Sequence, residues 1–201
     1  MKLVLASNNA KKLVELQALF APLGIELVTQ GSLGIPEAEE PFNTFVENAL
    51  VKARHAARLS GLPALADDSG LSVDALGGAP GVRSARYALD AGGEKSDAAN
   101  NERLLRELDG VADRRGRFVS ALVAVRSADD PEPLIAMGRW PGEILAAPSG
   151  EGGFGYDPLM FIPAAGRSVA ELSAAEKNAI SHRALAAALL IQQFREVWRL
   201  G

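Results

Sequence analysis

The first 29 residues alternate between strand-like and helix-like patterns, and this alternation constrains the fold more than any other feature. Residues 2–6 form a short apolar run, and residues 10–23 then carry apolar side chains at helical spacing. Asn8 or Asn9 can cap that helix at its start, and residues 26–29 predict a second strand. A strand, a tight turn, a helix and a further strand in this order are typical of an α/β fold.

The rest of the chain extends this pattern without repeats or linkers. A strand over residues 63–67 should end directly on Asp67 and Asp68, and a turn at Pro141-Gly142 should separate two further strands. The predicted helices cover residues 44–59, 97–108 and 181–199, with a brief capped turn at Ser173 to Glu176, and the other strands cover residues 117–125, 134–140, 143–147 and 159–162. We therefore expect an α/β fold with a mixed β-sheet flanked by helices.

Composition narrows the function classes. The net charge of −4 argues against a general nucleic-acid backbone binder, because such proteins usually carry a basic excess. No cysteine is present, which excludes thiolate metal sites and cysteine nucleophiles and fits a reducing cytoplasm. Neither a leader peptide nor an apolar run of membrane-spanning length is seen. We expect a cytoplasmic protein of one domain, residues 1–201, with no membrane or nucleic-acid partner.

Four short stretches carry candidate chemistry, although each alone also fits an ordinary solvated turn. They combine amide-rich turns, lysines, adjacent acids, an aromatic glycine loop and a His-Arg pair. They are Ser7-Asn8-Asn9-Ala10-Lys11-Lys12, Asp67-Asp68-Ser69-Gly70, Gly152-Gly153-Phe154-Gly155-Tyr156-Asp157 and Ser181-His182-Arg183. A metal-dependent enzyme acting on a nucleoside triphosphate needs this set of groups.

The two adjacent acids suit a cation site. In extended backbone the side chains of Asp67 and Asp68 point to opposite faces, so one can face a ligand while the other is held by protein donors. A Mg²⁺ ion that serves phosphates takes one or two carboxylates and fills its other positions with water and substrate. Glu39 or Glu40, in the acidic loop of residues 32–42, can supply the second carboxylate.

In wording and order, these stretches closely resemble the Ham1-like family of inosine/xanthosine triphosphate pyrophosphatases, which are house-cleaning nucleotide hydrolases. The resemblance runs from the first strand to the last helix and implies two lobes with a central substrate cleft. It implies that Asp68 is the catalytic base and a metal contact, and that Glu39 (preferred) or Glu40 is a metal ligand. The implied substrate contacts near the phosphates are Ser7, Asn8, Asn9, Ala10, Lys11, Lys12, Lys52, Asp67 and Ser69.

The resemblance also implies how the base is recognised. Its implied base contacts are Phe154, Gly155, Tyr156, Asp157, Lys177, His182 and Arg183. A planar base can stack on Phe154 or Tyr156. Hypoxanthine and xanthine present an acceptor at O6, which suits the donor-only side chain of Arg183, whereas adenine presents an amino group there.

The expected function is Mg²⁺-dependent hydrolysis of ITP, dITP and XTP to the monophosphate and pyrophosphate, which keeps deaminated purines out of DNA and RNA. A homodimer is expected from the resemblance alone. Two alternatives stay open: a related pyrophosphatase for pyrimidine or modified nucleotides, and a nucleotide-sensing module that binds without turnover.

Overall fold

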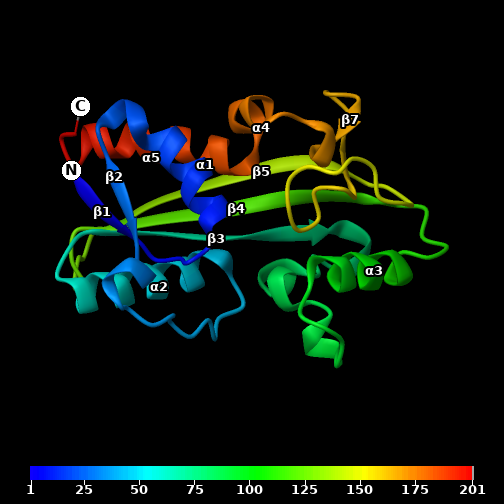
Figure 1. Ribbon diagram of the computed structural model, residues 1–201, viewed down its shortest axis with the longest axis horizontal. Coiled ribbons are helices and arrows are strands. Elements are labelled where there is room, and N and C mark those ends of the chain that lie inside the picture. The colour runs from blue at the N-terminus through cyan, green and yellow to red at the C-terminus, as the bar shows by residue number, and fades with distance from the viewer. Residues whose placement is uncertain (201) are drawn as a thin grey trace. The chain divides into compact units, whose positions relative to one another are not determined.

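One mixed β-sheet carries the fold, with strand order β2-β1-β3-β4-β5-β6-β7 (Figure 1). The structure is a computed structural model and describes residues 1–200. The strands are β1 (Lys2–Leu5), β2 (Glu26–Thr29), β3 (Ala64–Val73), β4 (Arg115–Val125), β5 (Leu134–Ile144), β6 (Met160–Ile162) and β7 (Arg167–Ser168). Strand β1 pairs in parallel with β2 and β3, whereas β6 pairs antiparallel with β5 and β7. The predicted α/β class with a mixed sheet is confirmed.

The helices begin where side-chain caps allow them to begin. They are α1 (Ala10–Phe20), α2 (Phe45–Ser60), α3 (Asp97–Glu107), α4 (Ala174–Ile180) and α5 (His182–Glu196). The side chain of Asn9, rather than Asn8, caps α1 by accepting from the N–H groups of Lys11 and Lys12. The Ser173 side chain caps α4 in a reciprocal capping box, so the predicted brief turn is a short helix.

The chain divides into two compact units. Unit 1 comprises residues 1–68, 120–138 and the chain from 182 on, and unit 2 comprises residues 69–119 and 139–181. Each unit has apolar cores of its own: the α1/α5 core and the α2 core in unit 1, and a third core in unit 2. No helix within residues 1–200 is both long enough and apolar enough to cross a bilayer.

Strand β1 shows how unit 1 is layered. Leu3 and Leu5 pack into the core under α1 and α5, while Val4 and Ala6 pack into the core beside α2. Figure 1 shows α1 and α5 on one face of this part of the sheet and α2 on the other. Both faces of β1 are therefore buried, as is usual for a parallel strand inside a sheet.

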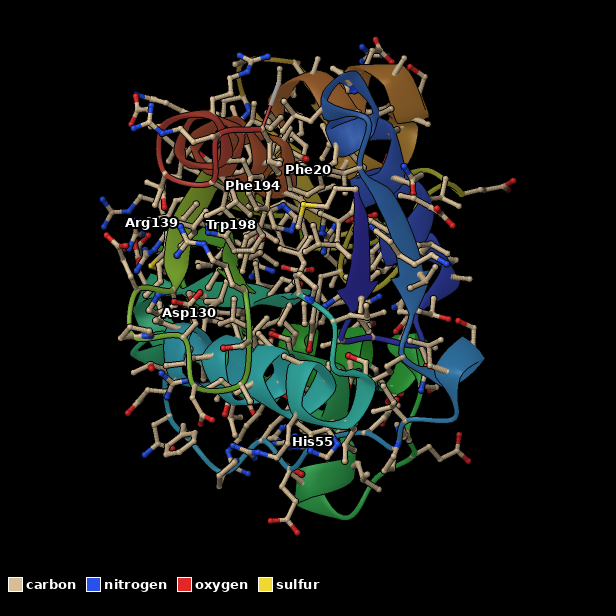
Figure 2. All side chains as sticks on the ribbon, turned by 90° about the vertical axis from the view of Figure 1, so that its left-hand side faces the viewer. Phe20, His55, Asp130, Arg139, Phe194 and Trp198 are labelled. Atoms are coloured by element: carbon tan, nitrogen blue, oxygen red, sulfur yellow. The ribbon has the colours of Figure 1, made fainter. Side chains whose placement is uncertain are left out.

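Three aromatic side chains close the α1/α5 core. The ring of Phe20 meets that of Phe194 edge to face at 5.8 Å, and Phe194 meets Trp198 at 4.9 Å (Figure 2). Such edge contacts add to the stabilisation from burial alone. They fix α5, which carries His182 and Arg183 at its start, against α1, which carries Lys12.

Two predicted strand ends are wrong. Strand β3 runs through the Asp67-Asp68-Ser69-Gly70 stretch to Val73, because Leu71 and Val73 continue into the core of unit 2. Gly70 permits this path, since a Cβ there would come within 2.5 Å of both Ser84 Oγ and the Gly81 carbonyl oxygen. The acidic pair therefore lies inside a strand, not at its end.

Strand β5 likewise has no turn at Pro141-Gly142. It continues to Ile144, whose pairing with Met160 extends the ladder to β6. Its burial alternates strictly through Pro141, which is exposed, and Gly142, which is buried, so a regular strand accommodates both residues. The separate strand expected at residues 143–147 does not exist.

Candidate active site

The acidic pair in β3 is split between the two faces of the sheet in unit 1. Leu65 packs into the α1/α5 core, and Ala64 and Ala66 pack into the α2 core. By the same alternation Asp67 faces α1 and α5, whereas Asp68 faces α2. The contacts of both carboxylates agree with this assignment, as the sequence predicted.

Asp67 is a buried, fully engaged carboxylate. Its Oδ2 lies 3.2 Å from Lys12 Nζ and 3.0 Å from the Arg183 guanidinium, and its Oδ1 accepts a hydrogen bond of 2.8 Å from Ser120 Oγ. Burial by itself would raise the pKa of Asp67, but the charges of Arg183 and Lys12 outweigh it and hold the pKa well below its usual range. Asp67 is therefore ionised at all physiological pH values and positions the two cations.

Arg183 is not placed as a base reader in this structure. Its side chain is buried, and its guanidinium pairs with Asp67 and with Glu15 of α1. Burial opposes its charge, yet the two carboxylates raise the pKa of Arg183 further. This side chain thus joins the start of α5 to the middle of α1 and to β3, a role that the sequence motif did not indicate.

Asp68 has a different environment. Its Oδ1 accepts a 2.7 Å hydrogen bond from Lys52 Nζ of α2, while its Oδ2 is buried and has no hydrogen-bond partner among residues 1–200. Burial raises the pKa of Asp68, and the ammonium of Lys52 opposes that rise only in part. A buried carboxylate oxygen without a partner is unusual in a folded protein, which makes Asp68 Oδ2 a candidate ligand-binding atom.

Glu40, rather than Glu39, is at this cluster. Glu40 Oε1 lies 3.5 Å from Lys52 Nζ, and its charge adds to the raised pKa of Asp68, whereas Glu39 is exposed. Glu40 is therefore the better placed of the two acids, while the choice of metal ligand between Glu39 and Glu40 stays a prediction. Within residues 1–200 no three His, Cys, Asp or Glu side chains form an enclosing metal site. Two carboxylates fit Mg²⁺ that keeps water and phosphate as its other ligands.

Two lysines from different helices converge on one backbone oxygen. The Asp67 carbonyl accepts from Lys12 Nζ at 3.3 Å and from Lys52 Nζ at 3.4 Å. Burial lowers the pKa of Lys12, while the raised pKa of Lys52 reflects Asp68 and Glu40, whose charges overcome the effect of burial. A pair of ammonium groups at one point is suited to neighbouring phosphates.

The turn before α1 is pre-formed. Ser7 Oγ accepts from the Asn9 N–H at 3.1 Å, and Asn8 Oδ1 accepts from the Gly31 N–H at 2.9 Å. Ala10 begins the helix, and Lys11 is exposed beside it. The turn thus brings a helix N-terminus, where an anion is favoured, to the end of β1.

The glycine loop in unit 2 forms a second cluster. Asp157 Oδ2 accepts from the Phe154 N–H at 2.9 Å and from Lys177 Nζ at 2.8 Å. The same Nζ lies 4.5 Å from the centre of the Phe154 ring. Gly153 is required beside this carboxylate, because a Cβ there would lie 2.1 Å from Asp157 Oδ2. The structure therefore brings together Phe154, Asp157 and Lys177 as predicted.

Tyr156 is a core residue and not a stacking surface. It is 5% exposed, packs in the core of unit 2, and donates its hydroxyl to the Ser84 carbonyl at 2.9 Å. Burial raises its pKa, so the hydroxyl stays protonated. The expectation that a base can stack on Tyr156 is corrected accordingly, whereas the Phe154 side chain is only half-buried.

His182 is buried at the first position of α5, and the helix backbone there packs directly against Gly138 of β5. A Cβ at Gly138 of β5 would lie 1.9 Å from the His182 carbonyl oxygen and 2.6 Å from the Ala186 nitrogen. Only glycine lets the helix backbone approach the strand this closely.

Sequence reasoning missed four residues. Ser120 is a polar residue in the otherwise apolar run of β4, which is a signal for a buried partner. Glu15 follows Lys12 by three positions on α1, a spacing that places them on one helix face. Asp97 and Asn101 of α3 bind the N–H and the carbonyl of Gly155, and no pattern in the sequence indicated these contacts.

The chain is similar to known proteins over nearly its whole length. The model of the Ham1 family matches residues 3–193. The chain is 68% identical to the dITP/XTP pyrophosphatase of Methylibium petroleiphilum, covering 98% of this chain and 99% of the relative. It is 64% identical to the dITP/XTP pyrophosphatase of Leptothrix cholodnii, covering 100% of both.

Solved structures show the same fold. A HAM1 protein from Coxiella burnetii superposes with a TM-score of 0.90 at 46% identity, covering 98% of this chain and 100% of that chain. The Ham1 protein of Staphylococcus aureus superposes with a TM-score of 0.84 at 39% identity, covering 98% of each. From this agreement in sequence and in structure it follows that the chain belongs to the Ham1 family.

Proposed function

We propose that this chain is a nucleoside triphosphate pyrophosphatase that hydrolyses ITP, dITP and XTP to the monophosphate and pyrophosphate. In the cell this reaction removes deaminated purine nucleotides before they enter DNA or RNA. The names of the relatives support this assignment. The observation that carries it is that Asp68 Oδ2 is buried and unpartnered while Lys52 binds the Oδ1 of the same carboxylate. Lys12 and Lys52 both donate to the neighbouring Asp67 carbonyl oxygen. The two units together constitute one pyrophosphatase domain, residues 1–201.

The lysines hold the phosphates. Lys12 and Lys52 neutralise charge on the triphosphate and on the pyrophosphate that leaves, where fixed cations stabilise the transition state. The N–H groups and side chains of residues 7–11 at the start of α1 add donors for an anion. Ser69, which follows Asp68 in β3, is a further substrate contact.

Asp68 performs the proton transfer. Its Oδ2 accepts the proton of the water that attacks phosphorus, which is general-base catalysis. Asp68 and Glu40 are the residues that hold Mg²⁺, and the ion supplies electrostatic stabilisation of the phosphate oxygens when bound. Lys52 donates to Asp68 Oδ1 and so keeps Oδ2 oriented toward the reacting water.

Phe154 and Lys177 recognise the base. The Phe154 ring stacks on the purine, and the Lys177 ammonium, which carries only donors, is compatible with O6 of hypoxanthine or xanthine and not with the amino group of adenine. Asp157 holds both groups in place. His182 is a further base contact, whereas Arg183 holds Asp67 from inside the protein.

The test is pyrophosphate release from ITP, dITP, XTP, GTP, ATP, CTP and UTP, with and without Mg²⁺. We expect turnover of the first three, weak turnover of GTP and ATP, and loss of activity on chelation. A preference for pyrimidine triphosphates would instead support the related pyrophosphatase. Tight binding of ITP without pyrophosphate release, in the presence of Mg²⁺, would identify a nucleotide-sensing module.

The proposal extends to the oligomeric state of the enzyme and to its cellular location. We place the enzyme in the cytoplasm as a homodimer, and light scattering coupled to size-exclusion chromatography measures the assembly directly. A monomer at micromolar concentration would refute the dimer without affecting the proposed reaction.

A further inference from the structure

Two side chains of helix α3 hold Gly155 by the two peptide groups that flank its Cα. Asp97 Oδ2 accepts a 2.7 Å hydrogen bond from the Gly155 N–H, and Asn101 Nδ2 donates a 3.0 Å hydrogen bond to the Gly155 carbonyl. Asp97 and Asn101 are four residues apart and so share one face of α3. We call this pair the α3 clamp.

The helix that carries the α3 clamp is firmly fixed within unit 2. Ser96 caps its start by accepting from the Ala99 N–H, and Asn100 Oδ1 accepts a buried 2.7 Å hydrogen bond from the Ala88 N–H. Leu104 is fully buried in the core of unit 2. Because α3 is anchored in the core of unit 2, the α3 clamp holds the glycine loop at a fixed position relative to that core.

The α3 clamp completes the backbone restraint on Phe154. The N–H of Phe154 is held by Asp157 Oδ2, and the next N–H, that of Gly155, is held by Asp97. Gly155 itself has a left-handed backbone with φ of +62°, a conformation that its missing Cβ permits. The peptides on both sides of the Phe154 Cα are therefore held, which fixes the direction of the Phe154 Cα–Cβ bond. Asn101 holds the following peptide and so keeps Gly155 in place.

We propose that Asp97 and Asn101 are positioning residues for base recognition, because they hold the Phe154 ring where the purine stacks. The inference rests on the proposed function, in which Phe154 is the stacking surface. In the proposed function the phosphates are bound by Lys12, Lys52 and the metal at Asp68, and neither Asp97 nor Asn101 has a part in binding them. Loss of the α3 clamp should thus weaken binding of the base and leave the phosphate chemistry intact.

Truncation of the clamp residues should not unfold the protein. Asn101 makes a single hydrogen bond to the loop, and its Oδ1 is buried without a partner among residues 1–200, so its removal also removes an unpaired acceptor. Asp97 is exposed. The variant Asp97→Asn keeps an acceptor for the Gly155 N–H and serves as the conservative rescue.

The experiment compares Asp97→Ala, Asn101→Ala and Asp97→Asn with a control on the same helix. The control is Glu102→Gln, which changes an exposed side chain whose ion pair with Arg106 is 3.9 Å long. Three constants are measured with Mg²⁺ in excess: kcat and KM for ITP, and the inhibition constant of inorganic tripolyphosphate, which has no base. Stacking on an aromatic ring contributes enough that its partial loss should raise KM about tenfold.

We expect each alanine variant to raise KM for ITP with kcat within about twofold and with an unchanged inhibition constant for tripolyphosphate, and Asp97→Asn to restore KM. The inference is overturned if KM for ITP matches that of Glu102→Gln, or if KM and the inhibition constant rise together. Phe154→Ala distinguishes failure of the proposed base site from failure of the α3 clamp. If it leaves KM for ITP unchanged, the proposed base site fails and the clamp with it. If it raises KM while the clamp variants do not, the clamp alone fails.

Discussion

Replacing each of the two neighbouring aspartates of β3 by asparagine should have opposite effects. Asp67→Asn should lower stability, whereas Asp68→Asn should lower turnover. Asp67→Asn leaves Arg183 and Lys12 buried beside an uncharged amide. Breaking a buried ion pair by removing one partner typically costs about 3–5 kcal/mol of unfolding free energy. For a chain of this length each kcal/mol corresponds to about 2–4 °C, so the thermal midpoint should fall by roughly 6–20 °C.

Asp68→Asn is the matched control, because it changes the same atoms one residue further along the same strand. Burial already raises the pKa of Asp68, so a neutral side chain is tolerated there and the midpoint should move by only a few degrees. Turnover of ITP should nevertheless fall by about 10²–10⁴-fold, which is the usual loss on removing a general base.

The pH dependence provides a second check on Asp67. Its folded pKa lies below its unfolded value, so its contribution to stability is fully present above the unfolded pKa of about 3.9 and is lost as the pH falls toward the folded pKa. The difference in midpoint between the wild-type protein and Asp67→Asn should therefore be constant from pH 6 to 8 and shrink in acid.

Circular dichroism melts across pH, together with pyrophosphate release from ITP, measure all of these quantities. An Asp67→Asn protein that melts with the wild type at neutral pH refutes the assignment of Asp67 to structure. Normal turnover by a folded Asp68→Asn protein refutes its role as the base.

Three further predictions follow from individual contacts. Gly138→Ala should lower the unfolding free energy by more than about 2 kcal/mol in denaturant titrations, because its Cβ would meet the backbone of His182; wild-type stability would contradict the close approach. Tyr156→Phe should cost about 1–3 kcal/mol of stability by leaving the buried Ser84 carbonyl unpaired, and wild-type stability in the same titrations would contradict the importance of this hydrogen bond. Glu40→Gln should raise the Mg²⁺ concentration needed for half-maximal activity and Glu39→Gln should not, and the reverse order would return Glu39 to the site.

The sequence alone determined much of the local structure. The alternation of apolar runs and helical spacing fixed the α/β class, and a polar residue marked the start of α1 at Asn9. Periodicity also placed Asp67 and Asp68 on opposite faces of one strand. These are local properties of the backbone, so they survive without knowledge of any distant contact.

Only the tertiary structure decided which of these residues are structural and which are presented to a ligand. Arg183 became an internal partner of Asp67 because α5 packs close to β5 at Gly138 and directs its first turn at β3. Tyr156 entered the core because Ser84, 72 positions away, supplies its hydrogen-bond acceptor. Glu40, and not Glu39, is paired with Lys52 of α2. In each case the deciding atoms are far apart in the sequence, and burial and charge pairing act through space rather than along the chain.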